Sequence, residues 1–371
     1  MARRQPEGAK APSPPSPPPS RRPPDPPSAP GLSALWQRLL RGREAGVLFA
    51  VLLLGAILTL LTRPAPGEGG PPKFLLQANW QSILEATAPV GIIALGETLV
   101  IVTGGIDLSV GAVMGLAGVV AARLMTQGYG PIPVLPMPVS LLLGVLAGGL
   151  CGLVNGLLIV GCRMPPFIAT LGMFSAARGL AYYIVGSLIG SLPAAYLFLG
   201  KGALLGLPVP VVVMLVLGGA AGLWAARSGT GRHVYAIGGS ELAARLSGVA
   251  VGRVKVGVYT FAGLMSGLAG VLLTAYLGNA QGNQGETLEL DVIAAVVVGG
   301  VSLSGGEGSI LGALLGALLM RILRNGLVLQ GVQAEYQLVV LGLVIWLASV
   351  VDTLRAGRWG VGSWGRKVVG S

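Results

Sequence analysis

The chain has 371 residues, of which 53% are hydrophobic, 11% are charged and 61 are glycine, and its formal net charge is +11. So few charges exclude a disordered chain, two cysteines exclude a disulfide scaffold, and the long apolar runs argue against a soluble enzyme. The composition predicts an all-α polytopic membrane protein whose partner is the lipid bilayer, because helices satisfy their own backbone hydrogen bonds in lipid.

Residues 1–44 are predicted to form a Pro-rich, basic tail outside the membrane. Twelve of the 26 prolines fall within the first 31 residues, and residues 1–44 carry a net charge of +5. A segment of this composition cannot bury enough apolar surface to form a core. We therefore expect a disordered tail.

Ten apolar segments follow, and several are close to the roughly 20 residues that span a bilayer. They cover 45–62, 83–102, 106–125, 138–160, 166–186, 208–226, 256–277, 288–302, 308–330 and 336–352. The segment 288–302 is weak and is predicted to be short or broken. These segments predict about ten transmembrane helices in one domain, 45–353, followed by a second basic tail at 354–371.

The positive charge gathers where the chain leaves the predicted spans. The stretches 1–44, 227–255 and 353–371 carry +5, +4 and +4, and the rest of the chain carries −2. An even number of spans places 18 Lys and Arg residues on the side of both termini and three on the other side. Because basic loops stay inside, the N- and C-termini are predicted to be cytoplasmic. A nucleic-acid partner is not expected, because the basic patches lack a folded reading element and aromatic platforms.

Glycines at helical spacing predict close packing between spans. In lipid, helices have no hydrophobic drive to associate, so small faces that let backbones approach carry the packing. One span repeats glycine every fourth residue, and three others carry one such pair each. These positions are Gly144, Gly148, Gly152, Gly156, Gly111, Gly115, Gly263, Gly267, Gly312 and Gly316.

Polar residues interrupt the apolar pattern at 103–111. Paired glycines break the run, and Asp107 and Ser109 then open the next segment. Asp107 is predicted either to cap free backbone N–H groups of a helix start or to line a pathway, because a carboxylate at membrane depth is costly. The two roles are compatible. Four other charged residues are expected to pair with one another inside the membrane: Glu85, Glu97, Arg178 and Arg321.

The basic loop at 231–248 contains the signals of a short helix. Ser240 is a plausible N-cap, Glu241 and Arg245 are four residues apart and can pair, and Gly248 can end the helix. The small apolar side chains of this helix are Ala243, Ala244 and Leu246. From the residues alone, a helix that a partner protein grips and a solvated loop helix remain equally open.

Residues 303–307 read Leu-Ser-Gly-Gly-Glu, which looks like the signature loop of ABC ATPases. A true ATPase would also carry a Gly-x4-Gly-Lys-Ser/Thr phosphate loop, and Ala195 stands where its first glycine would precede Lys201. The segment is therefore predicted to be a glycine-rich turn. With His233 as the only histidine, no catalytic residue and no metal site are predicted.

Several motifs together resemble the membrane permease subunits of bacterial ABC importers for monosaccharides, the ribose-type permeases. They are Gly-Ile-Asp-Leu-Ser-Val-Gly at 105–111, Pro-Phe-Ile-Ala-Thr-Leu-Gly at 166–172, Tyr-Ala-Ile-Gly-Gly at 235–239, Ala-Arg-Leu-Ser-Gly at 244–248 and Glu-Leu-Asp-Val-Ile-Ala-Ala-Val-Val-Val-Gly-Gly at 289–300. The resemblance covers about 75–353. Ser304 departs from the alanine that the family pattern has in the glycine turn, and the Pro-rich tail lies outside the resemblance.

The resemblance implies a permease bundle like that of type II importers in the bacterial cytoplasmic (inner) membrane. Two copies, as a homodimer, would form the pathway, an ABC ATPase subunit would use ATP and Mg, and an extracytoplasmic sugar-binding protein would deliver the monosaccharide. This chain would bind no cofactor. The coupling loop, 227–255, would seat in the ATPase through Glu241, Ala243, Ala244, Arg245 and Gly248. The candidate lining of a route for a neutral sugar is Asp107, Ser109, Asn155, Asp291 and Asn325.

Three other functions are also compatible with the sequence. A permease for nucleosides or branched-chain amino acids would belong to the same superfamily. An ion-coupled secondary transporter would use its intramembrane carboxylates to bind the coupling ion. A membrane scaffold would transport nothing and would not associate with an ATPase.

Overall fold

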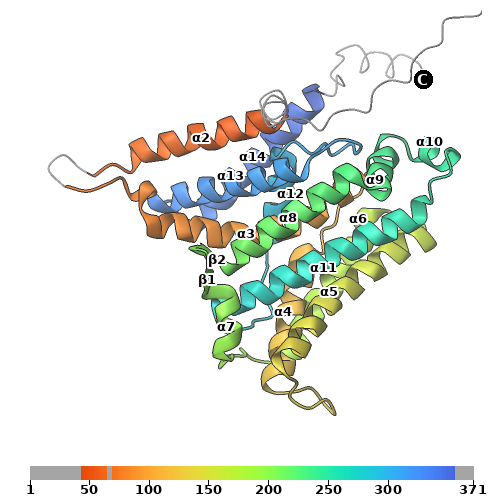
Figure 1. The fold of residues 1–371 in the computed structure, drawn as a ribbon, viewed down its shortest axis with the longest axis horizontal. Coiled ribbons are helices and arrows are strands. Elements are labelled where there is room, and N and C mark those ends of the chain that lie inside the picture. The colour runs from red at the N-terminus through yellow and green to blue at the C-terminus, as the bar shows by residue number, and fades with distance from the viewer. Residues whose placement is uncertain (1–42, 65–68, 356–371) are drawn as a thin grey trace, which may run out of the picture. The chain divides into compact units, whose positions relative to one another are not determined.

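The structure is a computed structural model that describes residues 43–64 and 69–355. Within these residues almost every element is a helix, and the only strands form one short antiparallel hairpin (Figure 1). The elements in chain order are α2 (Arg43–Leu61), η1 (Lys73–Leu75), α3 (Gln77–Val102), α4 (Val110–Thr126), α5 (Met137–Gly161), α6 (Pro166–Val185), α7 (Ala194–Lys201), β1 (Ala203–Leu204), β2 (Leu207–Pro208), α8 (Val209–Arg227), α9 (Gly229–Gly239), α10 (Glu241–Leu246), α11 (Val251–Leu277), α12 (Leu288–Val298), α13 (Ile310–Leu329) and α14 (Ala334–Arg355). The predicted tails, 1–44 and 354–371, lie almost entirely outside the described residues.

Seven of the described helices are long and apolar enough to cross a membrane, namely α2, α3, α5, α6, α8, α11 and α13. Each of the ten predicted spans coincides with one helix, although the ends differ by a few residues. The helix α4 has 17 residues and α12 has 11, fewer than the roughly 20 that a perpendicular crossing needs. The membrane class is therefore confirmed, and the count of ten spans goes beyond what the helices establish.

The short α12 confirms the prediction for 288–302. The helix ends at Val298 and is followed by Gly299 and Gly300. Gly300 has a φ of 93°, which side-chain-bearing residues rarely adopt, so the paired glycines stop the helix.

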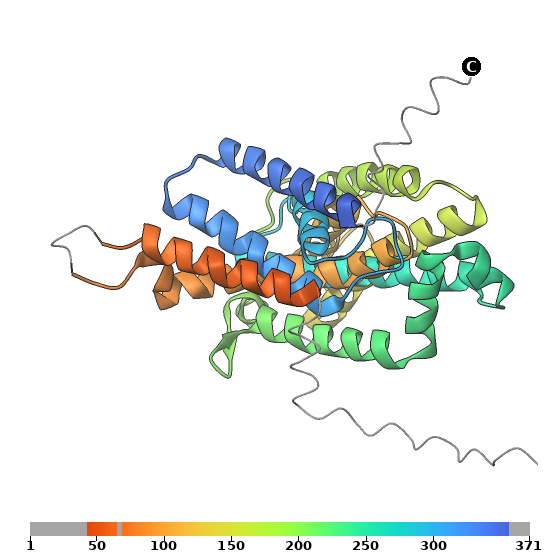
Figure 2. The same ribbon diagram turned by 90° about the horizontal axis from the view of Figure 1, so that it is seen from above.

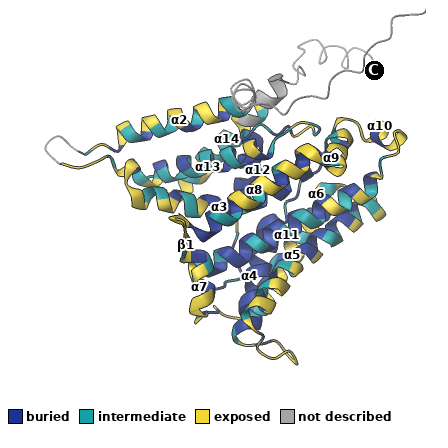
Figure 3. Cartoon of the chain, viewed as in Figure 1, coloured by how far each residue is buried: buried dark blue, intermediate teal, exposed yellow. Residues whose placement is uncertain are grey.

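The central helix of the bundle is α3. Residues 87–102 of α3 are all buried, whereas α2 is largely exposed (Figure 3), and 89% of the apolar window of α3 is buried against 17% for α2. A helix that is apolar on all sides can be buried all round. This position brings the end of α3, at Val102, into contact with several other elements of the bundle.

The predicted glycine seam is confirmed between α5 and α11. A Cβ added at Gly148 would lie 2.5 Å from the carbonyl oxygen of Gly263, and one added at Gly152 would collide with the carbonyl oxygen of Tyr259. The two backbones therefore touch directly, with no room for a side chain between them.

The other glycine pairs pack in the same way. A Cβ at Gly115 would lie 2.5 Å from the carbonyl oxygen of Gln284. One at Gly316 would collide with the carbonyl oxygen of Ala295, which joins α13 to α12. The helical spacing of glycine thus predicted which faces meet a neighbour, though not which neighbour.

Candidate functional site

Two short helices form a hairpin where the sequence predicts the basic loop. Ser228 caps α9, since its Oγ accepts a hydrogen bond from the N–H of Gly231 at 2.8 Å. Ser240 caps α10, accepting from the N–H of Ala243 at 3.2 Å, which confirms the predicted N-cap. The helix α9 was not predicted, because its glycines have low helix propensity. We call α9 and α10 together the α9–α10 hairpin.

Glu241 forms an ion pair within α10 and another that ties α10 to α11. Its Oε1 lies 2.9 Å from Nη2 of Arg245, which confirms the predicted pair, and its Oε2 lies 2.6 Å from Nζ of Lys255. The Lys255 hydrogen bond, followed by that of Arg245, lowers the pKa of Glu241. The stabilisation is therefore fully present above the usual glutamate pKa of about 4.3, and it is lost as the pH falls through the lowered pKa. Lys255 was missed, because it lies on another helix.

Gly248 ends the hairpin as predicted. Its φ is 83°, and its N–H donates to the carbonyl oxygen of Arg245 at 3.1 Å. A left-handed glycine directly after a short helix is the usual way to reverse the chain.

The apolar side chains of α10 do not share one face. Ala244 is buried against the bundle, so its side chain is not available to a partner, whereas Ala243 is exposed. Leu246 is 81% exposed, and Leu242, which was not predicted to belong to this face, is 69% exposed. These two leucines are four residues apart and thus lie on the same outer face of the helix.

The α9–α10 hairpin rests on two glycine turns of the bundle. A Cβ added at Gly238 would collide with the carbonyl oxygen of Val102 and with the backbone nitrogen of Gly306. The N–H of Gly306 donates to that same Val102 oxygen at 2.9 Å, and Gly305 and Gly306 both have φ near 80°. We call Val102, Gly238, Gly305 and Gly306 the glycine seat.

The predicted turn at 303–307 is confirmed, and it has a structural role. It connects α12 to α13 and forms part of the glycine seat. Nearby, the hydroxyl of Tyr235 donates to the carbonyl oxygen of Gly308 at 3.1 Å. The glycines that make this turn resemble an ATPase signature loop therefore serve a close backbone contact with α9.

The break between α3 and α4 holds a buried polar cluster of Glu97, Asp107, Ser109 and Asn155. Oδ1 of Asp107 accepts from the Ser109 N–H at 2.8 Å and from its hydroxyl at 2.5 Å, so Asp107 stabilises the turn before α4, whose own N-cap Ser109 makes no side-chain cap hydrogen bond. Asn155 Nδ2 donates to Ser109 Oγ at 3.0 Å, and the Asp107 N–H donates to Glu97 Oε1 at 3.1 Å. All four residues are buried, so they hold α3, α4 and α5 together.

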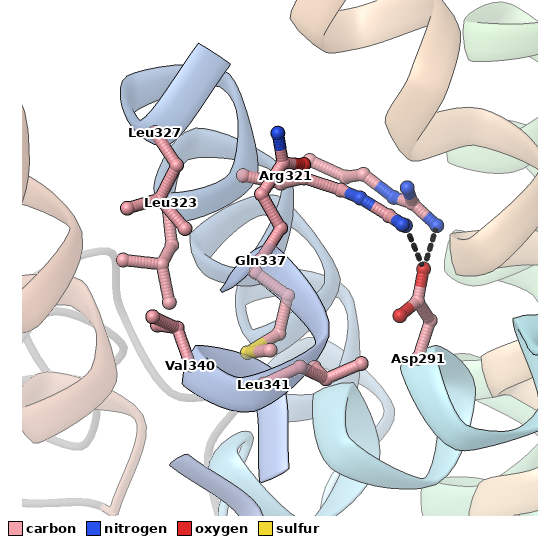
Figure 4. Close-up of a pocket in the computed structure, with 9 residues that line it drawn as sticks. Asp291, Arg321, Leu323, Leu327, Gln337, Val340 and Leu341 are labelled. Atoms are coloured by element: carbon pink, nitrogen blue, oxygen red, sulfur yellow. Dashed lines mark hydrogen bonds and ion pairs between the residues drawn. The ribbon is translucent and has the colours of Figure 1, made fainter. Parts of the chain in front are cut away.

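An ion triad joins α12 to α13. Oδ2 of Asp291 lies 2.8 Å from Nη2 of Arg321 and 2.7 Å from Nη1 of Arg324 (Figure 4). The side chains of Asp291 and Arg321 are 9% and 12% exposed, and that of Arg324 is 39% exposed. Figure 4 shows both guanidinium groups pointing toward this one carboxylate oxygen. The triad therefore neutralises a buried aspartate with two arginines.

The five predicted pathway residues thus fall in three separate places. Asp107, Ser109 and Asn155 meet in the buried polar cluster, and Asp291 is in the ion triad. Asn325 lies near the start of α3 and exchanges hydrogen bonds of 2.8 and 3.2 Å with Asn79. The structure does not bring these five side chains together into one lining.

The prediction that four intramembrane charges pair with one another was wrong. In the described part of the chain Glu97 accepts from backbone, Arg178 donates to the carbonyl oxygens of Gly282 and Gln284, and Arg321 pairs with Asp291. These partners lie in the turn after α3, in the loop before α12 and in α12 itself, and the sequence does not state which of these segments packs beside each charge.

This is a helical membrane fold with a capped hairpin seated against two glycine turns, and it defines the chain as a multi-pass membrane protein. The chain belongs to the family described as the permease component of the branched-chain amino acid transport system, whose model matches residues 79–349.

Several curated relatives are named as import permeases for sugars. The chain is 46% identical over 284 residues to the ribose import permease protein RbsC of Bacillus subtilis, which covers 76% of this chain and 86% of that protein. It is 42% identical to RbsC of Escherichia coli over 314 residues, 83% and 93% of the two chains. It is 37% identical to the fructose import permease protein FrcC of Rhizobium meliloti over 327 residues, 85% and 87% of the two chains. No solved structure matches the chain.

Proposed function

We propose that this chain is the membrane permease subunit of an ATP-driven importer that takes up a monosaccharide. The observation that carries the proposal is the 46% identity to a ribose import permease across most of both chains. The similarity to a fructose import permease supports a sugar substrate more broadly. In this role the chain performs no covalent chemistry, and the ATPase, its ATP and its Mg belong to a partner subunit.

The α9–α10 hairpin is the surface that we assign to the ATPase. Its outer face offers Leu242 and Leu246, two exposed leucines beside charged side chains, as an interface core with a polar rim. A push on α9 would pass through the glycine seat to the end of α3 and the turn at 103–109, because these backbones touch. The hairpin is thus placed to transmit a movement of the ATPase into the bundle.

We assign the contact with a second copy to the side of α6 and α14. Seen from above, α6 and α14 lie along one side of the bundle and α8 along the opposite side (Figure 2). On α6, a Cβ at Gly172 or Gly179 would meet no atom within 4 Å, and Tyr183 is 75% exposed. A helix face with small and aromatic exposed residues fits close packing against another chain. The sugar route would run between the two copies.

The charge distribution supports a cytoplasmic hairpin. The stretch 227–255 carries +4, and cytoplasmic loops of helical membrane proteins are rich in Lys and Arg. Both termini and the hairpin would then lie inside, and the binding protein would deliver the sugar to the opposite side.

The experiment that tests the function is uptake by vesicles containing this chain with its ATPase and binding protein. We expect ATP-dependent uptake of labelled ribose or fructose that survives collapse of the ion gradients. Uptake of adenosine or leucine only would show a permease for another substrate. Uptake that needs an ion gradient and no ATP would show a secondary transporter, and failure of the chain to co-purify with any ATPase would favour a scaffold.

Replacing Leu242 by Glu should weaken binding of the ATPase at least about tenfold, because a charge would be buried at the centre of an apolar contact. Co-purification and titration of the ATPase with the purified chain would measure it. Leu205→Glu is the control, since Leu205 is an even more exposed leucine but lies between β1 and β2. Equal ATPase binding by both variants would show that the hairpin is not part of the interface.

A further inference from the structure

A deep apolar cavity opens between α3, α8, α9 and α11. Its volume is about 460 Å³, and its walls include Leu217 and Trp224 of α8 and Gly257 and Phe261 of α11. Leu99 of α3, which is buried, lies at its inner end. The cavity is separate from the buried polar cluster and from the ion triad, and neither the glycine seat nor the outer leucines of α10 line it.

The polar residues of the cavity lie at helix ends. Arg253 is the third residue of α11, and Thr230 is the second residue of α9. Trp224 lies three residues before the end of α8, and tryptophan is enriched at the level of lipid headgroups. The cavity therefore runs from a polar end at the membrane surface to an apolar interior.

Arg253 supplies uncompensated positive charge at the polar end. Its side chain is exposed and forms no ion pair with any residue the structure describes. The only acidic residue of 227–255, Glu241, is already paired with Arg245 and Lys255. An anion is therefore the partner that fits this end.

The outer side of the cavity faces lipid. Of the residues that line the cavity on α8, Ala220 is exposed and Trp224 is 38% exposed, and beside them the helix exposes Leu215, Val216 and Leu223, which are 51%, 65% and 53% exposed. Apolar side chains on a membrane-spanning helix that no protein element covers contact the bilayer. A lipid can therefore enter the cavity from the side, without passing through the protein.

We infer that this cavity binds one anionic phospholipid, with an acyl chain between α8 and α11 and the phosphate on Arg253. Basic pockets between transmembrane helices select acidic headgroups, and each methylene buried in an apolar site adds to affinity. Free phosphate could use only the positive charge of Arg253, and a neutral lipid could use only the apolar interior. An anionic phospholipid uses both.

Glycine positions provide a matched pair of variants that fill or spare the cavity. Gly257 and Gly219 are both exposed on long apolar helices, and a Cβ at either would meet no atom within 4 Å. They differ in that only Gly257 lines the cavity. Gly257→Leu should therefore occupy the place of the acyl chain without a clash, and Gly219→Leu should not.

The test is lipid retention by the purified full chain, measured by native mass spectrometry during titration with phosphatidylglycerol or phosphatidylcholine. We expect the wild-type chain to retain phosphatidylglycerol preferentially. Gly257→Leu should bind it about tenfold more weakly, and Gly219→Leu should bind it as the wild type does. An excess of inorganic phosphate should not displace the lipid, because phosphate lacks the acyl chain.

Charge is tested in the same titration. Arg253→Gln should weaken phosphatidylglycerol binding about fivefold and remove the preference over phosphatidylcholine. Arg232→Gln, which removes an exposed charge of α9 outside the cavity, should change binding less than about twofold. Equal retention of the two lipids by the wild type would overturn the inference, as would undiminished binding by Gly257→Leu or Arg253→Gln, or displacement by phosphate alone.

Discussion

Gly238→Ala should reduce ATP-driven uptake about tenfold or more. The added methyl group would collide with the carbonyl oxygen of Val102 and the backbone nitrogen of Gly306, and neither backbone atom can rotate away. Overpacking of this kind costs about 1–3 kcal/mol, which is enough to displace α9 from the glycine seat. The measurement is the initial rate of sugar uptake into vesicles, with ATP hydrolysis followed in parallel.

The neighbouring residue provides the control for this variant. A Cβ at Gly239 would meet no atom within 4 Å, so Gly239→Ala should transport at nearly the wild-type rate. Both variants should insert into the membrane and elute as single species in size-exclusion chromatography. If Gly238→Ala transported sugar as well as Gly239→Ala, the seat could not be part of the coupling route.

Asp291→Ala should be the most destabilising single change in the ion triad. It leaves the buried guanidinium of Arg321 without its carboxylate, and breaking a buried ion pair in this way costs about 3–5 kcal/mol. Arg324→Gln should cost much less, because the Arg324 side chain is 39% exposed and solvent can compensate. The midpoint of thermal aggregation of the purified variants, followed by fluorescence-detected chromatography, would rank them.

A double variant separates unpaired charge from lost packing. Asp291→Leu combined with Arg321→Leu removes both buried charges, so it should recover most of the stability that Asp291→Ala loses. A double variant as unstable as Asp291→Ala would instead show that the triad matters through its shape and hydrogen bonds.

The features that sequence predicted well are those that depend on neighbouring residues. Ser240 and Gly248 begin and end α10 through local hydrogen bonds and a local φ, and Glu241 pairs with Arg245 one turn away. The short α12 follows from two adjacent glycines. Such signals lie within a few residues of the feature that they determine, so they can be read without knowing the fold.

The features that sequence missed depend on which helices are neighbours. Lys255 completes the ion pairs of Glu241 from α11, and Arg324 joins Arg321 on Asp291. Glu97 was expected to find a charged partner but accepts instead from the backbone of the turn that follows its own helix. The helix α9 was missed for another reason. The glycine that lets α9 approach the glycine seat, Gly238, also lowers the helix propensity of the segment.

Part of the contact between α5 and α11, at Gly148, Gly152 and Gly263, is made backbone to backbone, and this affects its thermodynamics. Packing two leucine faces would freeze their rotamers, whereas glycine at Gly148, Gly152 and Gly263 has no side-chain freedom to lose. The full van der Waals attraction between the backbones is therefore available to hold the helices together, without an opposing side-chain entropy. The two helices are therefore expected to move as one rigid unit, and any bending of the bundle should occur at other contacts.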